Sequence, residues 1–185
     1  VKGKVEYHIS SDQRITWSVS MENLRTEIEV KELPACEVAY VRHVGPYKGN
    51  DKLFEELFGK LMRWAGPRNL IQFPNTRMMT LYHDDPEITA EEKLRISVCM
   101  SVPKDTETDG DIGRMSVAGG QYAVGSFELD PHEYEDAWNL MMGGWLPESG
   151  YQPDDWLCYE NYLGTPDQHP EGKHVVEICI PVKPL

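Results

Sequence analysis

The chain has 185 residues, of which 40% are hydrophobic and 26% charged, and its formal net charge at pH 7 is −13. This composition is typical of one compact globular domain and excludes a disordered or fibrous chain. The negative charge repels phosphate backbones, so it argues against unaided binding to nucleic acid.

The sequence also indicates a compartment. No apolar run approaches the roughly 20 residues that span a bilayer, and no basic start followed by an apolar run marks a signal peptide, so we expect a cytoplasmic protein. Its first residue is Val1, which suggests a piece of a longer protein. The four cysteines form no CxxC pair and lie in apolar runs, which predicts buried, reduced thiols: Cys36, Cys99, Cys158 and Cys179.

The first half of the chain predicts strands around one helix. Residues 1–28 alternate weakly and contain a turn-prone Ser-Ser-Asp, so they indicate a hairpin or an ordered linker. Residues 28–44 predict two strands that are broken at Leu33-Pro34, because proline cannot donate to a central ladder. Apolar residues then recur at spacings of three and four, which predicts a helix ending near Gly66-Pro67. Two apolar strands are expected at 77–83 and 94–102.

The second half repeats this order. A strand region at 113–130 is followed by an expected helix around 133–145 and by strands at 158–163 and 174–182. Landmarks recur at similar separations, namely Pro46 with Pro131, Trp64 with Trp145, Pro86 with Pro166, and Pro103 with Pro181. We therefore predict an internal duplication. The fold class expected is α+β, with two tandem strand-helix-strand-strand modules (29–104 and 112–185), antiparallel sheets, a pseudo-twofold arrangement and a ligand cleft between the modules.

The strand at 158–163 contains the strongest candidate for a site. Side chains alternate along a strand, so Glu160 and Tyr162 share one face while Tyr159 and Asn161 share the other. A carboxylate among aromatic rings suits a lipophilic cation, although an edge-strand glutamate in solvent is the simpler interpretation. In the duplicated half, Tyr82 takes the place of Tyr162 and joins the candidate pocket.

Other candidates have weaker support. Trp64 and Trp145 close the two predicted helices and are candidate pocket walls, although a tryptophan in such a place is more often an ordinary core residue. Adjacent His83, Asp84 and Asp85 are more typical of a turn than of a metal site. No phosphate loop, dinucleotide fingerprint, nucleophile elbow or zinc motif is present, so we expect no cofactor, no metal and no catalytic residue of those classes.

Several ordered motifs together resemble a known family. They are VAYVRHVGPYKG at 38–49, HDDP at 83–86, GGQYAV at 119–124, WLPESGYQPDD at 145–155, CYENYL at 158–163 and HPEGK followed by VEICIPV near the C-terminus. They are similar to the GyrI-like effector-binding domain that is attached to AraC-type transcription regulators of bacteria. The resemblance implies that residues 29–185 form this domain, and that residues 1–28 join it to an absent helix-turn-helix domain that contacts DNA.

The resemblance also implies roles for the candidate residues. Family members that bind cationic drugs use an acid at the position of Glu160, with aromatic walls at Tyr162 and Trp145 and with Tyr82 from the other module. The expected function is therefore to sense a small cationic or aromatic effector. Two alternatives stay open: hydrolysis of reactive, cyclopropane-bearing compounds by the same acid and a tyrosine, or a gyrase-modulating interaction. The sequence leaves a homodimer possible and does not identify the effector.

Overall fold

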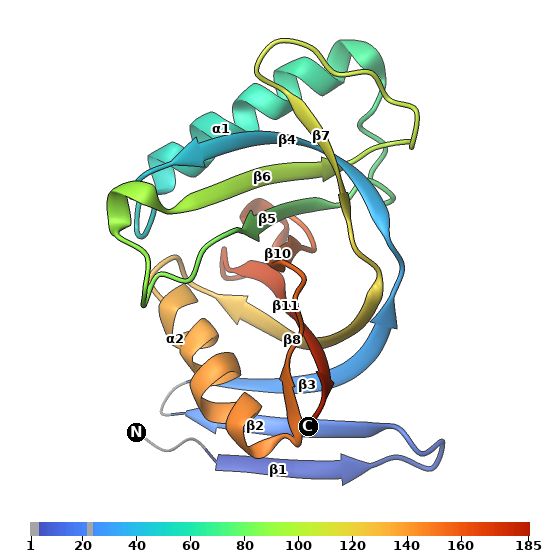
Figure 1. The fold of residues 1–185 in the computed structure, drawn as a ribbon, viewed down its shortest axis with the longest axis vertical. Coiled ribbons are helices and arrows are strands. Elements are labelled where there is room, and N and C mark those ends of the chain that lie inside the picture. The colour runs from blue at the N-terminus through green and yellow to red at the C-terminus, as the bar shows by residue number, and fades with distance from the viewer. Residues whose placement is uncertain (1–3, 22–23) are drawn as a thin grey trace. The chain divides into compact units, whose positions relative to one another are not determined.

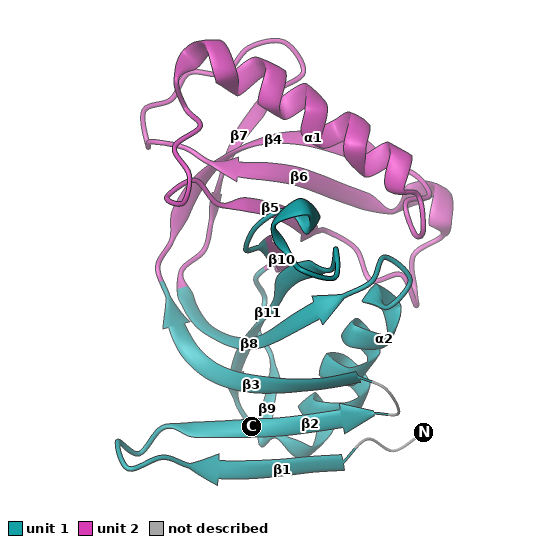
Figure 2. Cartoon of the chain, turned by 180° about the vertical axis from the view of Figure 1, so that it is seen from behind, with its two compact units in different colours: residues 1–33, 120–156, 162–185 teal, residues 34–119, 157–161 magenta. Residues whose placement is uncertain are grey.

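The computed structural model describes residues 4–21 and 24–185 (Figure 1). The chain forms two compact units, which Figure 2 distinguishes by colour. Unit 1 comprises residues 1–33, 120–156 and 162–185, and unit 2 comprises residues 34–119 and 157–161. Each unit is therefore assembled from separate stretches of the sequence, and each includes a segment of the opposite half of the chain.

Unit 1 contains an antiparallel sheet. Its strands are β1 (Lys4–Ile9), β2 (Ile15–Met21), β3 (Leu24–Leu33), β8 (Gly120–Leu129), β9 (Tyr151–Pro153) and β11 (His174–Pro184). Their order is β1-β2-β3-β8-β11, and β9 pairs with β11. Figure 1 shows β1 as the outermost strand of this group. The apolar side chains of β2 alternate with polar ones, so Trp17 and Val19 are buried, as a strand with one face on the core requires.

One helix packs on this sheet. The short helix α2 (Tyr134–Asn139) continues as a π-helical turn, Leu140–Trp145, which is followed by a 3-10 turn, Leu146–Glu148. The helix approaches the sheet closely at Gly125, where a β-carbon would lie 2.5 Å from the sulfur of Met141. A side chain at that position of β8 would therefore require Met141 and Phe127 to shift. A further 3-10 turn, Pro166–Gln168, precedes β11.

Unit 2 contains five further strands. Its strands are β4 (Cys36–Val44), β5 (Met78–Tyr82), β6 (Arg95–Ser101), β7 (Gly113–Val117) and most of β10 (Cys158–Tyr162), in the order β10-β5-β6-β4-β7. The helix α1 (Asp51–Ala65) begins where the side chain of Asn50 accepts a hydrogen bond from the Leu53 amide at 3.1 Å. Leu61, Trp64 and Ala65 of α1 pack with residues of β4 and β6. Two 3-10 turns complete the unit, Gly66–Arg68 and Glu91–Lys93.

The predicted α+β fold class is confirmed. The order of strand, helix, strand and strand occurs as β4-α1-β5-β6 and again as β8-α2-β10-β11, where the three-residue strand β9 is inserted before β10. The predicted break between strands also lies at Leu33-Pro34, between β3 and β4. The second helix differs from expectation, because only its first six residues are α-helical before the π-helical turn. The four cysteines are free thiols. Within residues 4–21 and 24–185, no helix has the length and hydropathy that crossing a membrane requires.

Candidate ligand-binding site

An aromatic cluster forms in unit 2 where α1 begins. Tyr47 is buried together with Leu94 and Ile96, and Tyr82 packs against them from the end of β5. The ring of Tyr47 lies 5.7 Å from that of Tyr82, and its edge meets Phe54 of α1 at 6.4 Å. These separations are typical of aromatic pairs in protein interiors. We call Tyr47, Phe54, Tyr82, Leu94 and Ile96 the Tyr47 cluster.

The backbone explains why these residues meet. Tyr82 and Ile96 are directly opposed on the antiparallel strands β5 and β6, so they share one face of the sheet. Between β4 and α1 the chain turns at Gly45, whose φ of 126° is unfavourable for other residues. This turn is followed at once by Tyr47, which is 8% exposed.

Glu160 is a buried acid of the same unit. It is only 2% exposed and lies on β10, which is next to β5 in the sheet. Burial raises the pKa of Tyr47 to about 12, and the negative charges of Glu160 and, to a smaller extent, Asp84 add to this effect. The carboxylate therefore lies near the phenol of Tyr47. At neutral pH this phenol keeps its proton and remains a hydrogen-bond donor.

The neighbour of Glu160 on β10 has different surroundings. Tyr159 is 2% exposed, and its hydroxyl accepts a hydrogen bond from Arg77 at 3.4 Å. The Arg77 guanidinium lies 6.0 Å from the centre of the Tyr159 ring. Tyr159 thus contacts Arg77 while Glu160 lies near Tyr47, as the alternation of side chains along a strand requires.

Trp64 lies outside the Tyr47 cluster. It packs with Ala39, Val41 and Leu61 in a neighbouring core cluster of unit 2. Its indole nitrogen donates a hydrogen bond to Asp109 at 2.7 Å, and the guanidinium of Arg68 lies 4.8 Å from the centre of its ring. The position of the Trp64 indole is therefore explained by apolar contacts within the core cluster and by its polar contacts with Asp109 and Arg68.

Trp145 and Tyr162 belong to unit 1. Trp145 is fully buried, meets Trp17 edge to face at 5.4 Å and stacks on Tyr151 at 6.3 Å. Among the described residues, its buried indole nitrogen has no hydrogen-bond partner. Tyr162 is half-buried at the end of β10. Of the five residues predicted from the sequence, the structure thus brings Glu160 and Tyr82 together in unit 2.

Sequence reasoning missed Tyr47. It follows a Gly-Pro turn, and only its place in the motif at 38–49 set it apart from an ordinary turn residue. His83, a polar neighbour of this region, follows β5 directly, and its amide donates a hydrogen bond to the Arg95 carbonyl at 3.1 Å. Its Nε2 lies 2.8 Å from the Ser97 hydroxyl, and burial, Arg42 and Arg95 together lower the pKa of His83 to about 4. At neutral pH His83 is therefore uncharged.

Unit 1 offers two further polar or open features. A surface hollow of about 420 Å³ is lined by Met21, Asn139, Gly143 and Gly144.

Ahead of α2, the possible metal-ligand atoms of Asp130, His132 and Glu133 lie within 4.8 Å of one another. The Glu133 carboxylate accepts a hydrogen bond from the Asp130 amide at 2.8 Å, and the Glu133 amide donates to the Asp130 carbonyl at 2.9 Å. Asp130 and Glu133 thus close a hydrogen-bonded turn directly ahead of α2.

Comparison with known proteins identifies the family. Residues 26–183 match the GyrI-like small molecule binding domain. This chain belongs to that family. The DNA gyrase inhibitor of Edwardsiella piscicida is 29% identical over 162 residues, which cover 85% of this chain and 98% of the relative.

Solved structures share the fold. The C-terminal domain of EcmrR has a TM-score of 0.70 at 20% identity, covering 86% of this chain and 99% of that one. In the EcmrR-DNA complex the TM-score is 0.72 at 18% identity, and the match covers 86% of this chain but only 58% of EcmrR. SAV2435 bound to tetraphenylphosphonium has a TM-score of 0.59 at 11% identity, covering 84% and 93% of the two chains. At these identities the likeness concerns the fold alone.

Proposed function

We propose that the Tyr47 cluster and Glu160 bind a small lipophilic cation, with Glu160 as its counter-charge. The observation that carries this proposal is a carboxylate only 2% exposed, close enough to Tyr47 to raise the pKa of its phenol. A buried carboxylate attracts a positive charge strongly, because little water screens the interaction. Aromatic faces add attraction for a cation, so Tyr47 and Tyr82 suit the apolar body of the same ligand.

The comparisons support this class of ligand. The family is one of small-molecule-binding domains, and a protein of the same fold, SAV2435, was solved with tetraphenylphosphonium, a lipophilic cation. Tetraphenylphosphonium is therefore the probe of choice. Its single charge is surrounded by four phenyl rings, which matches an acid beside aromatic side chains.

We further propose that binding is a sensing event. EcmrR, which was solved in complex with DNA, has a C-terminal domain of this fold. In our proposal an attached helix-turn-helix domain of the AraC type contacts DNA, and the ligand shifts its activity by differential affinity for two conformations. The charge of −13 makes DNA binding by this chain alone unfavourable. We accordingly expect no retardation of duplex DNA by the chain in a gel-shift assay. Retardation would contradict the proposal that DNA is bound by the attached domain and not by this chain.

The test of the binding site is calorimetric titration of tetraphenylphosphonium into wild type, Glu160→Gln and Glu55→Gln. Glu55 is exposed on α1 of the same unit, so both variants change the net charge equally, from −13 to −12. We expect Glu160→Gln to weaken binding more than about tenfold and Glu55→Gln to change it less than about twofold. Equal effects of the two variants would exclude Glu160 as a local anchor.

The same titration extends to the remaining aromatic residues predicted from the sequence. Trp145→Phe and Tyr162→Phe test the two predicted contacts from unit 1, because a ligand contact lowers affinity when it is trimmed while a core position alters stability alone. Mass analysis of the recovered ligand separates the sensor from a hydrolase. Intact ligand supports sensing, whereas a hydrolysed product would make the domain an enzyme that uses the same acid.

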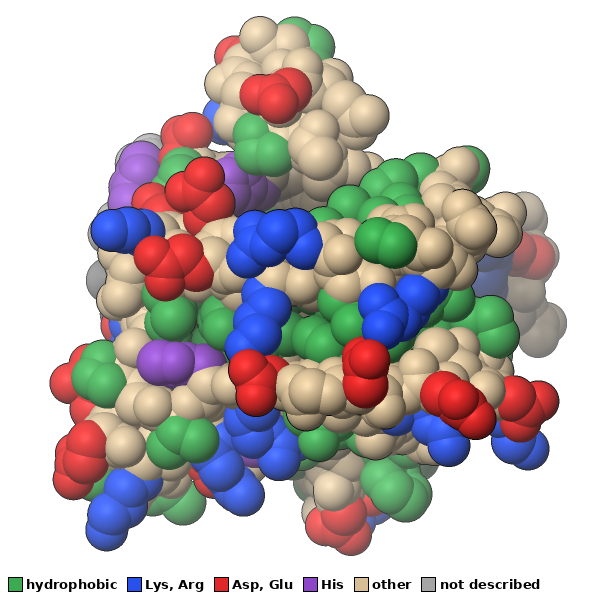
Figure 3. Space-filling view, turned by 90° about the horizontal axis from the view of Figure 1, so that it is seen from above, with side chains coloured by type: hydrophobic (Ala, Val, Ile, Leu, Met, Phe, Trp, Pro, Cys, Tyr) green, Lys and Arg blue, Asp and Glu red, His purple; other side chains and the backbone are tan. Residues whose placement is uncertain are grey.

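The second candidate function is modulation of DNA gyrase, which the names of the sequence relatives favour. An acidic surface that imitates DNA is one physical route to such an interaction. The face in Figure 3 instead intersperses acidic and basic side chains among apolar ones. A supercoiling assay with purified gyrase tests the idea directly. Inhibition that Glu160→Gln leaves unchanged would place this activity outside the proposed ligand site.

A further inference from the structure

The edge strand β1 carries an unusual row of apolar side chains. In its antiparallel pairing with β2, Val5 is opposite Val19, Tyr7 opposite Trp17, and Ile9 opposite Ile15. The row therefore continues the face of the sheet that buries Trp17 and Val19. Val5 is half-buried, but at Tyr7 and Ile9 this face is uncovered, because Tyr7 is 70% and Ile9 66% exposed. Exposed apolar patches that adjoin a core commonly mark interaction surfaces.

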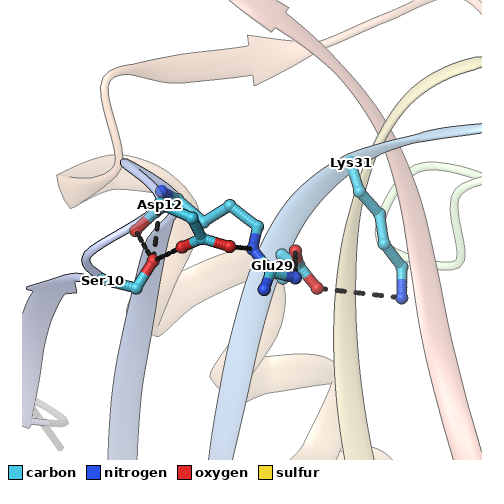
Figure 4. Close-up of polar contacts among 5 residues, drawn as sticks. Ser10, Asp12, Glu29 and Lys31 are labelled. Atoms are coloured by element: carbon cyan, nitrogen blue, oxygen red, sulfur yellow. Dashed lines mark hydrogen bonds and ion pairs between the residues drawn. The ribbon is translucent and has the colours of Figure 1, made fainter.

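Hydrogen bonds and ion pairs fix the hairpin that presents this edge. At the turn, the Ser10 hydroxyl donates to Asp12, and the Arg14 amide donates to the Ser10 hydroxyl at 3.2 Å (Figure 4). Arg14 in turn pairs with Asp12 at 2.6 Å and with Glu29 of β3 at 3.8 Å, and Lys31 lies 3.9 Å from Glu29. The ion pair between Arg14 and Glu29 links the turn to β3. The hairpin therefore holds β1 as an ordered strand.

The second edge of β1 is open for pairing. Among the described strands, β1 pairs with β2 and with no other. Proteins commonly protect such an edge with charged side chains, a proline or a bulge. In β1 there is no proline, all six of its residues, Lys4–Ile9, are in register with β2, and the charges of Lys4 and Glu6 pair with each other at 2.6 Å.

The sequence of β1 is complementary to itself. If two copies pair antiparallel with Tyr7 opposite Tyr7, then Val5 faces Ile9 on the apolar side of the sheet. On the other side Glu6 faces His8, so a carboxylate meets an imidazole that can donate a hydrogen bond to it at both ends of the contact. Side chains directly opposed on antiparallel strands interact most strongly. A twofold axis through Tyr7 satisfies both copies at once, as an isologous interface requires.

We propose that β1 is a homodimerisation edge, at which two copies of this chain join their sheets through antiparallel β1 strands with Tyr7 at the centre. The apolar row of one copy then continues into that of the other. This proposal is independent of the ligand-binding function of unit 2.

The test is sedimentation velocity of the 185-residue chain between about 1 μM and about 1 mM, the range in which a modest interface is half-occupied. We expect a reversible monomer-dimer equilibrium, and we expect Tyr7→Lys to raise its dissociation constant at least about tenfold, because two lysines would then oppose each other. The matched control is Ile88→Lys, at an apolar residue of unit 2 that is 84% exposed. A monomer at all concentrations, or equal effects of the two variants, would overturn the proposal.

A charge exchange tests the register separately and keeps the proposal testable if Tyr7→Lys fails to fold. His8→Glu sets two carboxylates opposite each other and is expected to weaken the dimer at least about threefold. Glu6→His combined with His8→Glu restores the carboxylate-imidazole pair and should restore wild-type association to within about twofold. Failure of the double variant to recover association, despite native circular dichroism, would exclude the Tyr7-centred register.

Discussion

The two units each contain an aromatic cluster, and the clusters differ in their polar surroundings. In unit 1, Trp17, Trp145 and Tyr151 pack edge to face and in a stack, and Trp145 is fully buried. In unit 2, the Tyr47 cluster has a buried acid nearby. The buried polar or charged side chains among residues 4–21 and 24–185 follow the same division. Only Thr26 of these lies in unit 1, while unit 2 has Thr76, Thr80, Ser97, Glu160 and Asn161.

This difference shows why aromatic residues alone are a poor guide to a site. Buried rings stabilise a core through contact area and ring geometry, and unit 1 is an example. A buried carboxylate carries an electrostatic cost that a hydrophobic residue of similar size avoids. Its presence beside the rings of unit 2 is therefore the better indicator of function. The predictions below test whether the two clusters have these separate roles.

The largest expected effect is on stability in unit 1. Trp145→Ala removes a fully buried ring that contacts Trp17 and Tyr151, so we expect the free energy of unfolding to fall by about 3–5 kcal/mol. Urea unfolding followed by circular dichroism measures this loss. The control is Trp156→Ala, since Trp156 is 55% exposed and should cost within about 0.5 kcal/mol. Equal losses would show that burial does not distinguish the two tryptophans.

A smaller effect is expected on binding in unit 2. Tyr82→Ala removes a ring that lies 5.7 Å from Tyr47, and we expect affinity for tetraphenylphosphonium to fall about five- to tenfold, the range of a partly desolvated cation-π contact. Calorimetry provides the measurement. Trp64→Phe keeps an aromatic ring in the neighbouring core cluster and should leave affinity unchanged. A larger loss of affinity in Trp64→Phe than in Tyr82→Ala would indicate that Trp64 contacts the ligand, as the sequence predicted.

The pKa of Tyr47 reports on its electrostatic interaction with Glu160. Removing the charge in Glu160→Gln should lower the pKa of Tyr47 from about 12, yet leave it above 10 because burial is the first cause of the shift. The titration is followed by the absorbance of tyrosinate near 295 nm. The transition that is missing in Tyr47→Phe is assigned to Tyr47. The raised pKa also means that Tyr47 stabilises the fold below pH 10 and that this contribution is lost as the pH rises through 12. No change of the Tyr47 pKa in Glu160→Gln would contradict their proximity.

The smallest effect concerns His83. Its pKa in the folded chain, about 4, is below the ordinary 6.5, so the unfolded chain binds more protons between these values. Its stabilising contribution is therefore complete above pH 6.5 and is lost as the pH falls through 4. We expect His83→Gln to lose less stability than wild type between pH 7 and pH 5, as measured by urea midpoints at both pH values. Parallel losses would show that His83 is readily protonated in the fold.

Periodicity and proline placement were enough to predict most of the fold. The period-two strands, the α1 spacing and the break at Leu33-Pro34 are local features, and local sterics decide them. The π-helical turn was not predictable, because no periodicity distinguishes it from an α-helix across Leu140–Trp145. The composition of the two units was also not predictable, since it depends on strand pairing between residues distant in the sequence, such as β3 with β8.

For the candidate site, the alternation along β10 indicated Glu160, and the duplication indicated Tyr82. Tyr47 was missed because its burial depends on the turn at Gly45 and on α1 and β6, and not on a local pattern. Trp64 and Trp145 were candidates because they end the two helices. Their surroundings in the structure are those of core residues, which sequence position alone does not reveal.

The most direct test of the central claim pairs a change in the ligand with a change in the protein. Tetraphenylphosphonium and the neutral triphenylphosphine oxide are titrated into wild type and Glu160→Gln, so that the coupling between ligand charge and the Glu160 charge is measured alone. The account predicts that Glu160→Gln weakens the cation more than about tenfold, or about 1.4 kcal/mol, and the neutral compound less than about twofold. Equal losses for both ligands would show that Glu160 has a structural role, and that the buried charge does not anchor a cation.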